Sequence, residues 1–489
     1  MQVTGRDLSH ERKCVRERQY RYPTVSGRYR HTLIEEAAVK FRDDFVWGAA
    51  TSSYQIEGAQ YEGGKGLHLW DEYVKEKGKV FENQRGDVSC DHYHLFREDV
   101  KLMKELGLKA YRFSVDWTRI MPEGKGKVNE EGVAFYNALI DELVANDIEP
   151  YLTLFHWELP MELYKRGGWM NPEMPEWFAQ YAAVIADRFS DRVKNFFTVN
   201  EPQCFVGLSF SEGVHAPWLQ LPDRETILMS HNALKAHGRA VQELRAHARQ
   251  PLVIGYAPTS GIALPATDKP EDIEAARQAY FGIPQEGTWA WNTAWWSDPV
   301  IFGKYPEEFL VRFEKDLPKI TDDDMKLISE PIDIYGQNIY LGYPVCMGED
   351  GKPELLSRNT GYAKSASNWP MTPEALYWGP KFLYDRYKKP IFITENGLAC
   401  HDWIHLDGKI HDPSRIDFTA RYLGALKRAA QEADIRGYFA WSLMDNFEWA
   451  EGFGQRYGLV FVDFKTQKRI PKDSAYWYRD VIRTNGENL

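Results

Sequence analysis

The chain has 489 residues and a formal net charge of −11 at pH 7. This acidic balance argues against nucleic acid or an anionic membrane as the main partner, because both carry dense negative charge. No run of apolar residues is long enough to span a bilayer, and the length fits one large barrel or two to three ordinary domains.

The first 40 residues differ in character from the rest of the chain. They are rich in Arg, His and Tyr and show no apolar period before Leu33. We expect residues 1–40 to be an N-terminal extension, either a poorly ordered natural arm or vector-encoded sequence, followed by one catalytic domain over residues 41–489. Met1–Arg30 has no apolar signal core, and the five cysteines are scattered and odd in number, which is typical of a reduced, cytoplasmic protein.

From Phe41 onward, short apolar runs alternate with helical patterns. The predicted strands are Phe45–Thr51, Ala110–Val115, Pro150–Phe155, Asn195–Val199, Leu252–Tyr256, Ile332–Tyr335, Pro390–Ile393 and Gly437–Trp441. The predicted helices are Arg97–Leu106, Phe135–Ala145, Pro175–Phe189, Thr226–Arg245 and Arg415–Glu432.

Eight strands alternating with helices at this length predict a single (β/α)₈ TIM barrel. A doubly wound open sheet is the alternative, but no Gly-rich phosphate turn follows any strand. The longest insertions are Thr259–Pro306 and Tyr340–Pro380, and they follow the fifth and sixth strands. These long loops therefore lie on the C-terminal face, where a barrel builds its active site.

Two of the predicted strands each end on a glutamate. Asn195–Val199 leads to Glu201, and the following Pro202 favours an extended conformation at Glu201. Pro390–Ile393 leads in the same way to Glu395. A pair of carboxylates about 5 Å apart is what a retaining glycosidase needs, one as acid/base and one as nucleophile.

Other polar and aromatic residues fall at the same ends of the predicted strands. A lone His156 or Trp441 would more often be structural, and a lone Arg112 would more often be a paired or solvated charge. Their joint placement on one face of a barrel reverses that interpretation and favours a site. The residues in this group are Gln55, Arg112, His156, Trp157, Asn338, Tyr340, Trp441, Glu448 and Trp449.

Six longer motifs surround these residues: Phe45-Val-Trp-Gly-Ala-Ala-Thr-Ser-Ser-Tyr-Gln-Ile-Glu-Gly58, Tyr111-Arg-Phe-Ser-Val-Asp-Trp117, His156-Trp, Thr198-Val-Asn-Glu-Pro202, Ile393-Thr-Glu-Asn-Gly397 and Trp441-Ser-Leu-Met-Asp-Asn-Phe-Glu-Trp449. By these motifs the chain resembles glycoside hydrolase family 1, the β-glucosidase family, from about Phe41 to about Ile482.

The resemblance implies Glu201 as acid/base and Glu395 as nucleophile. An ionised Glu395 should raise the pKa of Glu201, so that Glu201 is protonated when the substrate binds. Arg112 and the Tyr340 hydroxyl, which the family places near Glu395, would hold that carboxylate ionised. Once Glu395 is glycosylated its charge is lost, and Glu201 should then act as a base toward water.

The resemblance also implies a subsite for the non-reducing sugar. Asn200 would donate to the sugar 2-hydroxyl, Gln55 and Glu448 would each bind two hydroxyls, and Trp441 and Trp449 would present apolar faces. The residues implied to line this subsite are Gln55, His156, Asn200, Tyr340, Trp441, Glu448 and Trp449.

Three further residues are expected at the pocket, Trp369 and Cys204 on its outer side and Tyr457 near the glycone. Trp369 matches the family tryptophan that stacks on the second sugar, and Tyr457 stands where many relatives have phenylalanine, which adds a hydroxyl near C6 of the glycone. Cys204 follows Pro202 by two residues and is either a channel-lining residue at the mouth or a small core residue.

Two acidic or histidine-containing stretches have simpler interpretations. Cys90-Asp-His-Tyr-His94 leads directly into a predicted helix with no further ligand cluster nearby, so we expect no metal and no cofactor. Asp322–Asp324 is expected to start a helix, because anions suit the helix dipole there.

The sequence therefore predicts a retaining exo-β-glucosidase acting on cellobiose, short cello-oligosaccharides and aryl or alkyl β-glucosides. Side activity on galactosides or fucosides and transglycosylation are expected, while a monomer and a homodimer both remain open. A 6-phospho-β-glycosidase is the nearby alternative, disfavoured because Glu448 and Trp449 would repel or block a phosphate. A sugar-binding relative without catalysis is disfavoured by the retention of both glutamates with Asn200 and Arg112.

Overall fold

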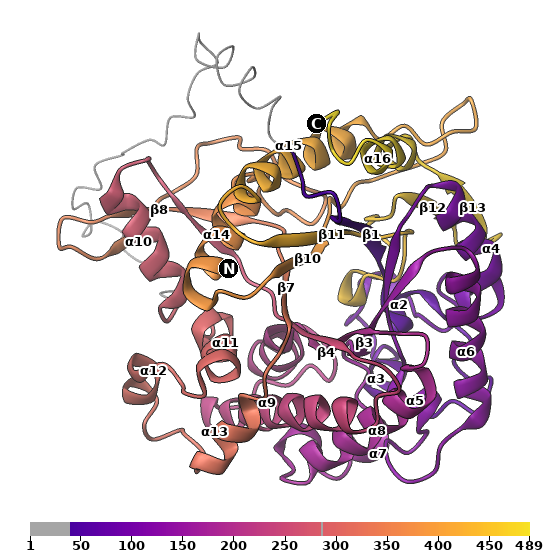
Figure 1. Cartoon of the computed structure of the whole chain (residues 1–489), viewed down its shortest axis with the longest axis horizontal. Coiled ribbons are helices and arrows are strands. Elements are labelled where there is room, and N and C mark those ends of the chain that lie inside the picture. The colour runs from indigo at the N-terminus through magenta and orange to yellow at the C-terminus, as the bar shows by residue number, and fades with distance from the viewer. Residues whose placement is uncertain (1–39, 285–286) are drawn as a thin grey trace, which may run out of the picture.

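The computed structural model describes residues 40–284 and 287–489, so all of the predicted N-terminal extension except Lys40 lies outside the described residues. Within the described ranges, a closed barrel of parallel strands is surrounded by helices (Figure 1). No helix in those ranges is both long and apolar enough to cross a membrane.

The barrel is a closed ring in the order β1-β11-β10-β7-β5-β4-β3-β2. Its strands are β1 (Val46–Ala50), β2 (Ala110–Ser114), β3 (Glu149–Phe155), β4 (Asn195–Asn200), β5 (Val253–Ala257), β7 (Ile334–Asn338), β10 (Ile391–Asn396) and β11 (Ile435–Trp441). Every predicted strand overlaps one of these, and each neighbouring pair is parallel. The predicted (β/α)₈ TIM barrel is therefore confirmed.

Most of the longer helices cover the outside of the barrel between consecutive strands (Figure 1). They are α4 (His92–Glu105), α6 (Glu130–Ala145), α8 (Met174–Phe189), α9 (Asp223–Ala246), α14 (Ala375–Tyr387), α15 (Pro413–Ala429) and α16 (Asp473–Arg483). The other α-helices are α2 (Ser53–Ile56), α3 (Leu69–Tyr73), α5 (Trp117–Ile120), α7 (Met161–Tyr164), α10 (Pro270–Phe281), α11 (Thr293–Phe302), α12 (Glu307–Arg312) and α13 (Asp322–Ile328).

Two helix starts bear on the sequence predictions. The predicted helix at Arg97 begins five residues earlier, at His92, because Asp91 takes a left-handed φ of 51° and the helix follows directly after it. The expected helix start at Asp322 is confirmed. Thr321 and Asp324 form a capping box there, and the acidic first turn complements the helix dipole.

The interior of the barrel is filled by aromatic rings opposite glycines. A Cβ on Gly255 would come within 2.6 Å of the Phe197 ring, and one on Gly437 within 2.5 Å of Phe392. Glycine is therefore required at these strand positions to give the rings room. This packed floor leaves space for a site only at the carboxyl ends of the strands.

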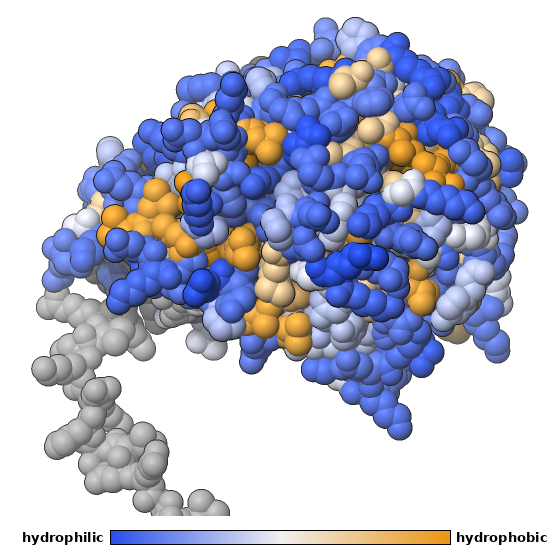
Figure 2. Space-filling view, turned by 90° about the horizontal axis from the view of Figure 1, so that it is seen from below, coloured by the Kyte–Doolittle hydropathy of each residue, from blue (hydrophilic) through white to orange (hydrophobic). Residues whose placement is uncertain are grey.

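The two long insertions after β5 and β7 build a structure of their own beside the barrel. The small sheet β6-β8-β9 pairs β6 (Ile262–Pro265), β8 (Gly342–Met347) and β9 (Pro353–Leu355), so that one strand comes from the first insertion and two from the second. A further hairpin pairs β12 (Val460–Asp463) with β13 (Lys468–Pro471). The face drawn in Figure 2 is mostly hydrophilic, with several apolar groups between the hydrophilic residues.

Candidate active site

Both predicted glutamates line one cavity of about 1710 Å³ at the carboxyl ends of the strands. Glu201 follows β4 directly, and Glu395 is the second-last residue of β10. Both side chains are almost fully buried, at 7% and 3% exposure. The cavity also contains His156, Trp441 and Glu448, so the strand ends bring the predicted residues together.

The backbone at Glu201 differs from the sequence prediction. Instead of being extended, Glu201 has a φ of 45°, while Pro202 is already helical and leads into the π-helix η3 (Gln203–Ser211). The N–H of Glu201 donates to the Ala257 carbonyl at 2.8 Å, which fixes this turn to the neighbouring strand. A left-handed conformation costs a non-glycine residue free energy, and such conformations concentrate where a site requires them.

Glu395 is held by a cation and a hydroxyl. Arg112 donates to its Oε1 at 2.8 Å, and the Tyr340 hydroxyl donates to its Oε2 at 2.8 Å. Burial raises the pKa of Glu395 above its ordinary value, and the charge and hydrogen bonds of Arg112 together with the Tyr340 hydroxyl oppose this rise. Both carboxylate oxygens are therefore oriented, and the ionised form is favoured by direct contact with a cation.

Within the described ranges no cation contacts Glu201, and its pKa is more strongly raised. Burial, and secondly the charge of Glu395, raise the pKa of Glu201 to about 7. Asn338 donates to Glu201 Oε1 at 2.8 Å, and hydrogen bonds from Cys204 and Thr259 also oppose the rise. The pair is thus unequal, with one glutamate held for ionisation and the other for protonation near neutral pH.

Asn200 lies between the two glutamates in one hydrogen-bonded network. Its Oδ1 accepts from Arg112 at 2.6 Å and from Asn338 at 3.2 Å. Its amide nitrogen must then donate to His156 Nε2, 3.1 Å away, which assigns the imidazole proton to Nδ1. Burial, followed by the charge of Arg112, lowers the pKa of His156 well below its usual range, so the ring is neutral.

This arrangement leaves donors directed at a ligand. His156 Nδ1 is buried and has no hydrogen-bond partner among the described residues. The second amide hydrogen of Asn200 is also uncommitted, since His156 is the one acceptor that its amide nitrogen has within the described part of the chain. Two neutral donors near the carboxylate pair are suited to sugar hydroxyls.

Gln55 and Glu448 form another part of the cavity. Gln55 lies in α2, beyond the end of β1, and its amide donates to Phe447 O at 2.9 Å, to Asn446 Oδ1 at 3.0 Å and to Glu448 Oε2 at 3.2 Å. Burial, with smaller contributions from Glu395 and Glu201, raises the pKa of Glu448 to about 8. Three buried carboxyl groups thus share one cavity, and the charge of Glu395 raises the pKa values of both Glu201 and Glu448.

Aromatic rings form the apolar side of the same cavity. The ring of His156 is stacked on those of Trp441 and Trp449, with centroids 5.8 Å and 6.2 Å apart. The ring centroids of Trp157 and Trp449 are 4.4 Å apart. Trp157 and Trp449 both have positive φ values, 91° and 49°, as Glu201 does. The flat apolar faces and the strained turns therefore occur at the same place.

The outer predicted residues also lie at this cavity. Trp369 is 39% exposed, with its ring 5.4 Å from Tyr340 and 6.4 Å from Tyr457. The added hydroxyl of Tyr457 lies 2.9 Å from the Ser367 hydroxyl, to which it is hydrogen-bonded. Cys204 is only 6% exposed, yet it lines the cavity, and its thiol is hydrogen-bonded to Glu201. It therefore lies closer to the glutamate pair than the predicted position at the mouth of the pocket.

Sequence reasoning missed two residues that hold the site together. Glu158 is fully buried and accepts from Ser53 Oγ at 2.5 Å, Tyr54 N at 3.2 Å and His156 N at 3.2 Å. It therefore ties the segment that carries Gln55 to the end of β3. Thr259, which follows β5, donates to the Asn338 carbonyl at 3.2 Å. The sequence signal for Thr259 was its place just beyond a strand, and a single threonine in that position is weak evidence for a site.

The histidines of the Cys90–His94 stretch are engaged by nearby carboxylates. His92 pairs with Asp99 at 2.7 Å, and His94 with Asp91 at 2.6 Å and Glu62 at 3.1 Å. None of these residues lines the cavity that contains Glu201 and Glu395.

Comparisons with known proteins agree with this geometry. The model of the glycosyl hydrolase family 1 matches residues 37–487. The chain is 42% identical over 451 residues to beta-glucosidase A of Thermotoga maritima, covering 91% of this chain and 98% of that protein. It is 40% identical over 451 residues to the 1,4-beta-D-glucan glucohydrolase of Thermotoga neapolitana, covering 91% of this chain and 99% of that protein. A solved structure of the beta-glucosidase from Thermotoga maritima in complex with glucoimidazole matches with a TM-score of 0.84 at 42% identity, over 91% of this chain and 99% of that one.

Proposed function

Since this chain belongs to glycosyl hydrolase family 1 and is a glycoside hydrolase of the β-glucosidase type, we propose that it is a retaining, exo-acting enzyme that removes terminal non-reducing β-D-glucosyl residues. The observation that carries the proposal is the unequal pair of glutamates. Arg112 and Tyr340 contact Glu395, whereas Glu201 has no cation in contact among the residues that the structure describes and has a pKa of about 7.

In the first step, Glu395 attacks the anomeric carbon as the bond to the aglycone oxygen breaks. Glu201 transfers its proton to that oxygen, so the aglycone leaves as a neutral alcohol. The product of the step is a glucosyl ester of Glu395. Arg112 orients one carboxylate oxygen and Tyr340 the other, which supports in-line attack by Glu395.

In the second step, water replaces the aglycone. The ester no longer carries the charge of Glu395. That charge is, after burial, the second cause that raises the pKa of Glu201. Glu201, now ionised, takes a proton from water as the water oxygen attacks the anomeric carbon, and Glu395 leaves as a carboxylate. Two inversions give a product with the β configuration of the substrate.

The glucosyl unit is bound by neutral donors, carboxyl groups and flat rings. We assign Asn200 to the 2-hydroxyl, where its uncommitted amide hydrogen strengthens a bond in the transition state. His156 Nδ1 is the second donor, and Gln55 and Glu448 bind the hydroxyls at the other side of the ring. Trp441 and Trp449 contact the C–H face.

The proposed substrates are cellobiose, short cello-oligosaccharides and aryl or alkyl β-glucosides. Galactosides and fucosides are proposed as side substrates, and transglycosylation occurs when an alcohol replaces water in the second step. We also propose a role in cellulose degradation, a monomeric or homodimeric state, and a reducing, cytoplasmic location. The proposed location rests on Cys90, Cys204 and Cys400, which are free thiols rather than disulfides.

Proton NMR of the first-formed sugar tests the mechanism. With nitrophenyl β-glucoside as substrate, the β anomer of glucose should appear first and the α anomer only later by mutarotation. Initial formation of the α anomer would mean an inverting enzyme and would exclude Glu395 as a nucleophile. The same assay with the nitrophenyl galactoside and fucoside ranks the side activities.

A further inference from the structure

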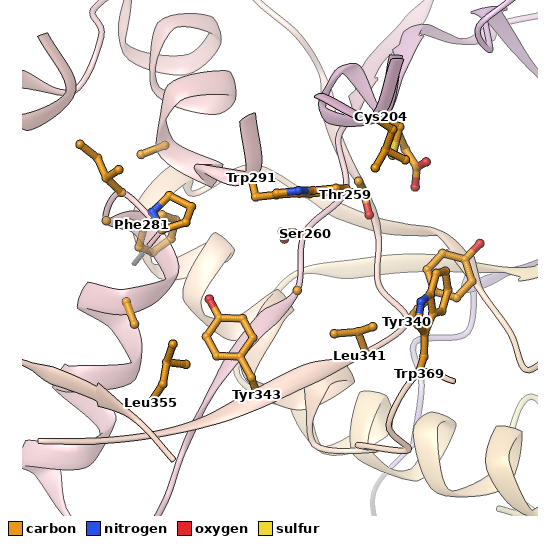
Figure 3. Close-up of a pocket in the computed structure, with 18 of the residues that line it drawn as sticks. Cys204, Thr259, Ser260, Phe281, Trp291, Tyr340, Leu341, Tyr343, Leu355 and Trp369 are labelled. Atoms are coloured by element: carbon orange, nitrogen blue, oxygen red, sulfur yellow. The ribbon is translucent and has the colours of Figure 1, made fainter. Parts of the chain in front are cut away.

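Several loops form the walls of the cavity. Figure 3 shows Tyr340 and Trp369 together at one wall, in the chain that follows β7. The Tyr457 ring lies 6.2 Å from the Tyr340 ring and 6.4 Å from that of Trp369, and it belongs to the connection between β11 and β12. We refer to residues 445–458 of this connection as the β11–β12 loop. The residues of this loop that line the cavity are Glu448, Trp449, Glu451, Gln455 and Tyr457.

Buried ion pairs close the base of the β11–β12 loop. The Asp445 carboxylate accepts from Gly458 N at 3.0 Å and from Arg456 Nη1 at 2.6 Å, so both ends of the loop meet at one side chain. Lys472, which is fully buried, donates to the same carboxylate at 2.6 Å and to Asp402 at 2.6 Å. These charge-assisted hydrogen bonds fix the base of the loop to the body of the protein.

The tip of the β11–β12 loop is held by a single side chain. Glu448 begins a tight turn, in which its N–H donates to Gly452 O at 2.6 Å. The next amide, Phe453 N, donates to Gln84 Oε1 at 2.6 Å, in the connection between β1 and α4. Within the described part of the chain, this is the one hydrogen bond that joins residues 449–454 to a segment outside the loop. Gln84 therefore pins the turn that carries Glu448.

Gly452 is required for this close approach. Its φ of 56° is left-handed, a conformation that glycine adopts without a steric penalty. A Cβ at this position would also collide with Gln84 Oε1. The turn is therefore shaped to receive the glutamine oxygen, because any side chain at position 452 would occupy its place.

The segment that presents Gln84 is itself strained and braced. Glu82 and Asn83 both take left-handed φ values, 51° and 55°, which are costly for residues other than glycine. Asn83 Oδ1 accepts from Gly78 N at 2.7 Å, and the Val80 side chain is buried. Strain of this kind persists where the surrounding structure requires it, and here it directs Gln84 toward the turn.

We propose that Gln84 is a positioning residue for Glu448 and thereby determines how strictly the enzyme selects glucosides. Gln84 is not among the described residues that line the cavity, so it acts through the turn. The turn holds the Glu448 carboxyl group 3.2 Å from the Gln55 amide, where both face the sugar hydroxyls. The proposal rests on the proposed β-glucosidase function, in which Glu448 binds hydroxyls on the side of the ring away from the 2-hydroxyl.

Substrate selectivity tests the proposal first. Gln84→Met keeps the length of the side chain and removes the accepting oxygen. It should lower kcat/KM for nitrophenyl β-glucoside by about fivefold, the effect of one hydrogen bond. The glucoside-to-fucoside ratio of kcat/KM should fall with it, because fucose lacks the 6-hydroxyl and carries the 4-hydroxyl in the other configuration. Gln84→Glu, which keeps an accepting oxygen, should stay within about twofold of the wild-type ratio.

Gln250→Met is the matched control for this selectivity measurement. Gln250 is a half-buried glutamine whose amide donates to the Ser190 carbonyl at 2.8 Å, and it precedes β5 at the opposite end of the barrel. Its ratio should equal that of wild type. Equal ratios in Gln84→Met and Gln250→Met would overturn the proposal.

A double-mutant cycle tests whether Gln84 acts through Glu448. Glu448→Ala should itself lower kcat/KM for nitrophenyl β-glucoside. Adding Gln84→Met to Glu448→Ala should then cost less than about twofold, against about fivefold in wild type, because no carboxyl group remains to be positioned. Equal costs in the two backgrounds would mean a general structural role for Gln84 and would contradict the assignment.

Hydrogen exchange tests the contact without turnover. Measured by mass spectrometry, the amides of residues 448–454 should exchange about fivefold faster in Gln84→Met than in wild type, while Gly458 at the base should not change. Unchanged exchange at the tip together with normal release of β-glucose would reject the role of Gln84 and keep the β-glucosidase. Faster exchange at the tip with α-glucose formed first would reject the retaining mechanism and leave the role of Gln84 in place.

Discussion

Arg112 in β2 donates a 2.8 Å hydrogen bond to Glu395 in β10, across the top of the barrel. The same guanidinium donates to Asn200 Oδ1 at 2.6 Å, and both its own side chain and that of Glu395 are almost fully buried. A buried cation needs a carboxylate partner, and here that partner is the proposed nucleophile. One arginine therefore fixes the positions of the proposed nucleophile and of the residue proposed to donate to the sugar.

This asymmetry predicts different phenotypes for the two glutamates. Glu395→Gln should abolish turnover on every glucoside, because no nucleophile remains. Glu201→Ala should impair cellobiose far more than dinitrophenyl β-glucoside, by a factor of about 10² or more, since an activated phenol leaves without protonation. Azide should rescue Glu201→Ala and give β-glucosyl azide, detected by NMR. If Glu395→Ala instead gave the β-azide, the two roles would be exchanged.

The raised pKa of Glu201 predicts a pH-dependent stability difference. The folded-state pKa is about 7 against an ordinary value of 4.5, so the native state binds the proton more tightly than the unfolded chain does. That contribution is fully present below pH 4.5 and is lost as the pH rises toward 7. Relative to wild type, Glu201→Gln should therefore gain about 3 kcal/mol in the free energy of unfolding between pH 5 and pH 8.

Urea unfolding of both proteins at the two pH values measures this gain. The control is Glu105→Gln, which removes an exposed glutamate at the end of α4 and should show no such trend. A difference between Glu201→Gln and wild type that stays constant across this pH range would mean that burial does not hold a proton on Glu201.

The barrel and the positions of both glutamates could be predicted from sequence because each signal is local. An apolar run ends at a polar residue, and parallel strands place such ends on one face. The conformation of Glu201 could not be predicted, because the following proline favours an extended residue. The hydrogen bond from its N–H to Ala257 and the turn into η3 override that preference, and both depend on residues distant in sequence or on the barrel itself.

The insertions were predicted as long loops, and their internal structure was missed. β6 pairs with β8, although 76 or more residues separate them, as the register Ile262 with Gly342 shows. Such pairing leaves no periodic signal in either segment. The connecting role of Glu158 was missed for a similar reason, since its donors Ser53 and Tyr54 lie more than 100 residues away.

Glu448 predicts discrimination against 6-phosphates. It shares a buried cavity with two other carboxyl groups, none of the described residues pairs a cation with it, and burial already raises its pKa to about 8. A phosphate there would add negative charge at the place where burial already disfavours the ionised form of Glu448. kcat/KM for nitrophenyl β-glucoside should therefore exceed that for its 6-phosphate by at least about 10². A preference for the 6-phosphate would reject this account of the loop after β11.

Trp369 tests the subsite next to the scissile bond. Its ring is partly exposed and lies 5.4 Å from Tyr340, a position suited to stacking on the second sugar. Trp369→Ala should raise KM for cellobiose by about tenfold and raise KM for nitrophenyl glucoside less, because a phenol has fewer contacts to lose. Trp403→Ala, which removes an exposed tryptophan that does not line the cavity, is the control. Equal effects of Trp369→Ala on both substrates would argue against a stacking platform.

Cys204 connects the channel wall to the acid/base. Burial raises the pKa of its thiol well above the ordinary value, so the thiol stays protonated. It donates a hydrogen bond to Glu201. This hydrogen bond lowers the pKa of Glu201, against the larger effect of burial. Cys204→Val has a similar volume and no donor, so the basic limb of kcat/KM against pH should move to higher pH, while Cys204→Ser should leave the limb near its wild-type position.

Glucose inhibition separates the two roles considered for Cys204. Because the residue lines the cavity beside Glu201, Cys204→Val should change the glucose inhibition constant and the share of transglycosylation, while kcat on nitrophenyl glucoside stays within about twofold. A residue that only packs under η3 would instead shift the thermal unfolding temperature and leave the inhibition constant and the pH profile unchanged. A normally folded Cys204→Val with wild-type inhibition and an unmoved basic limb would therefore remove Cys204 from the site.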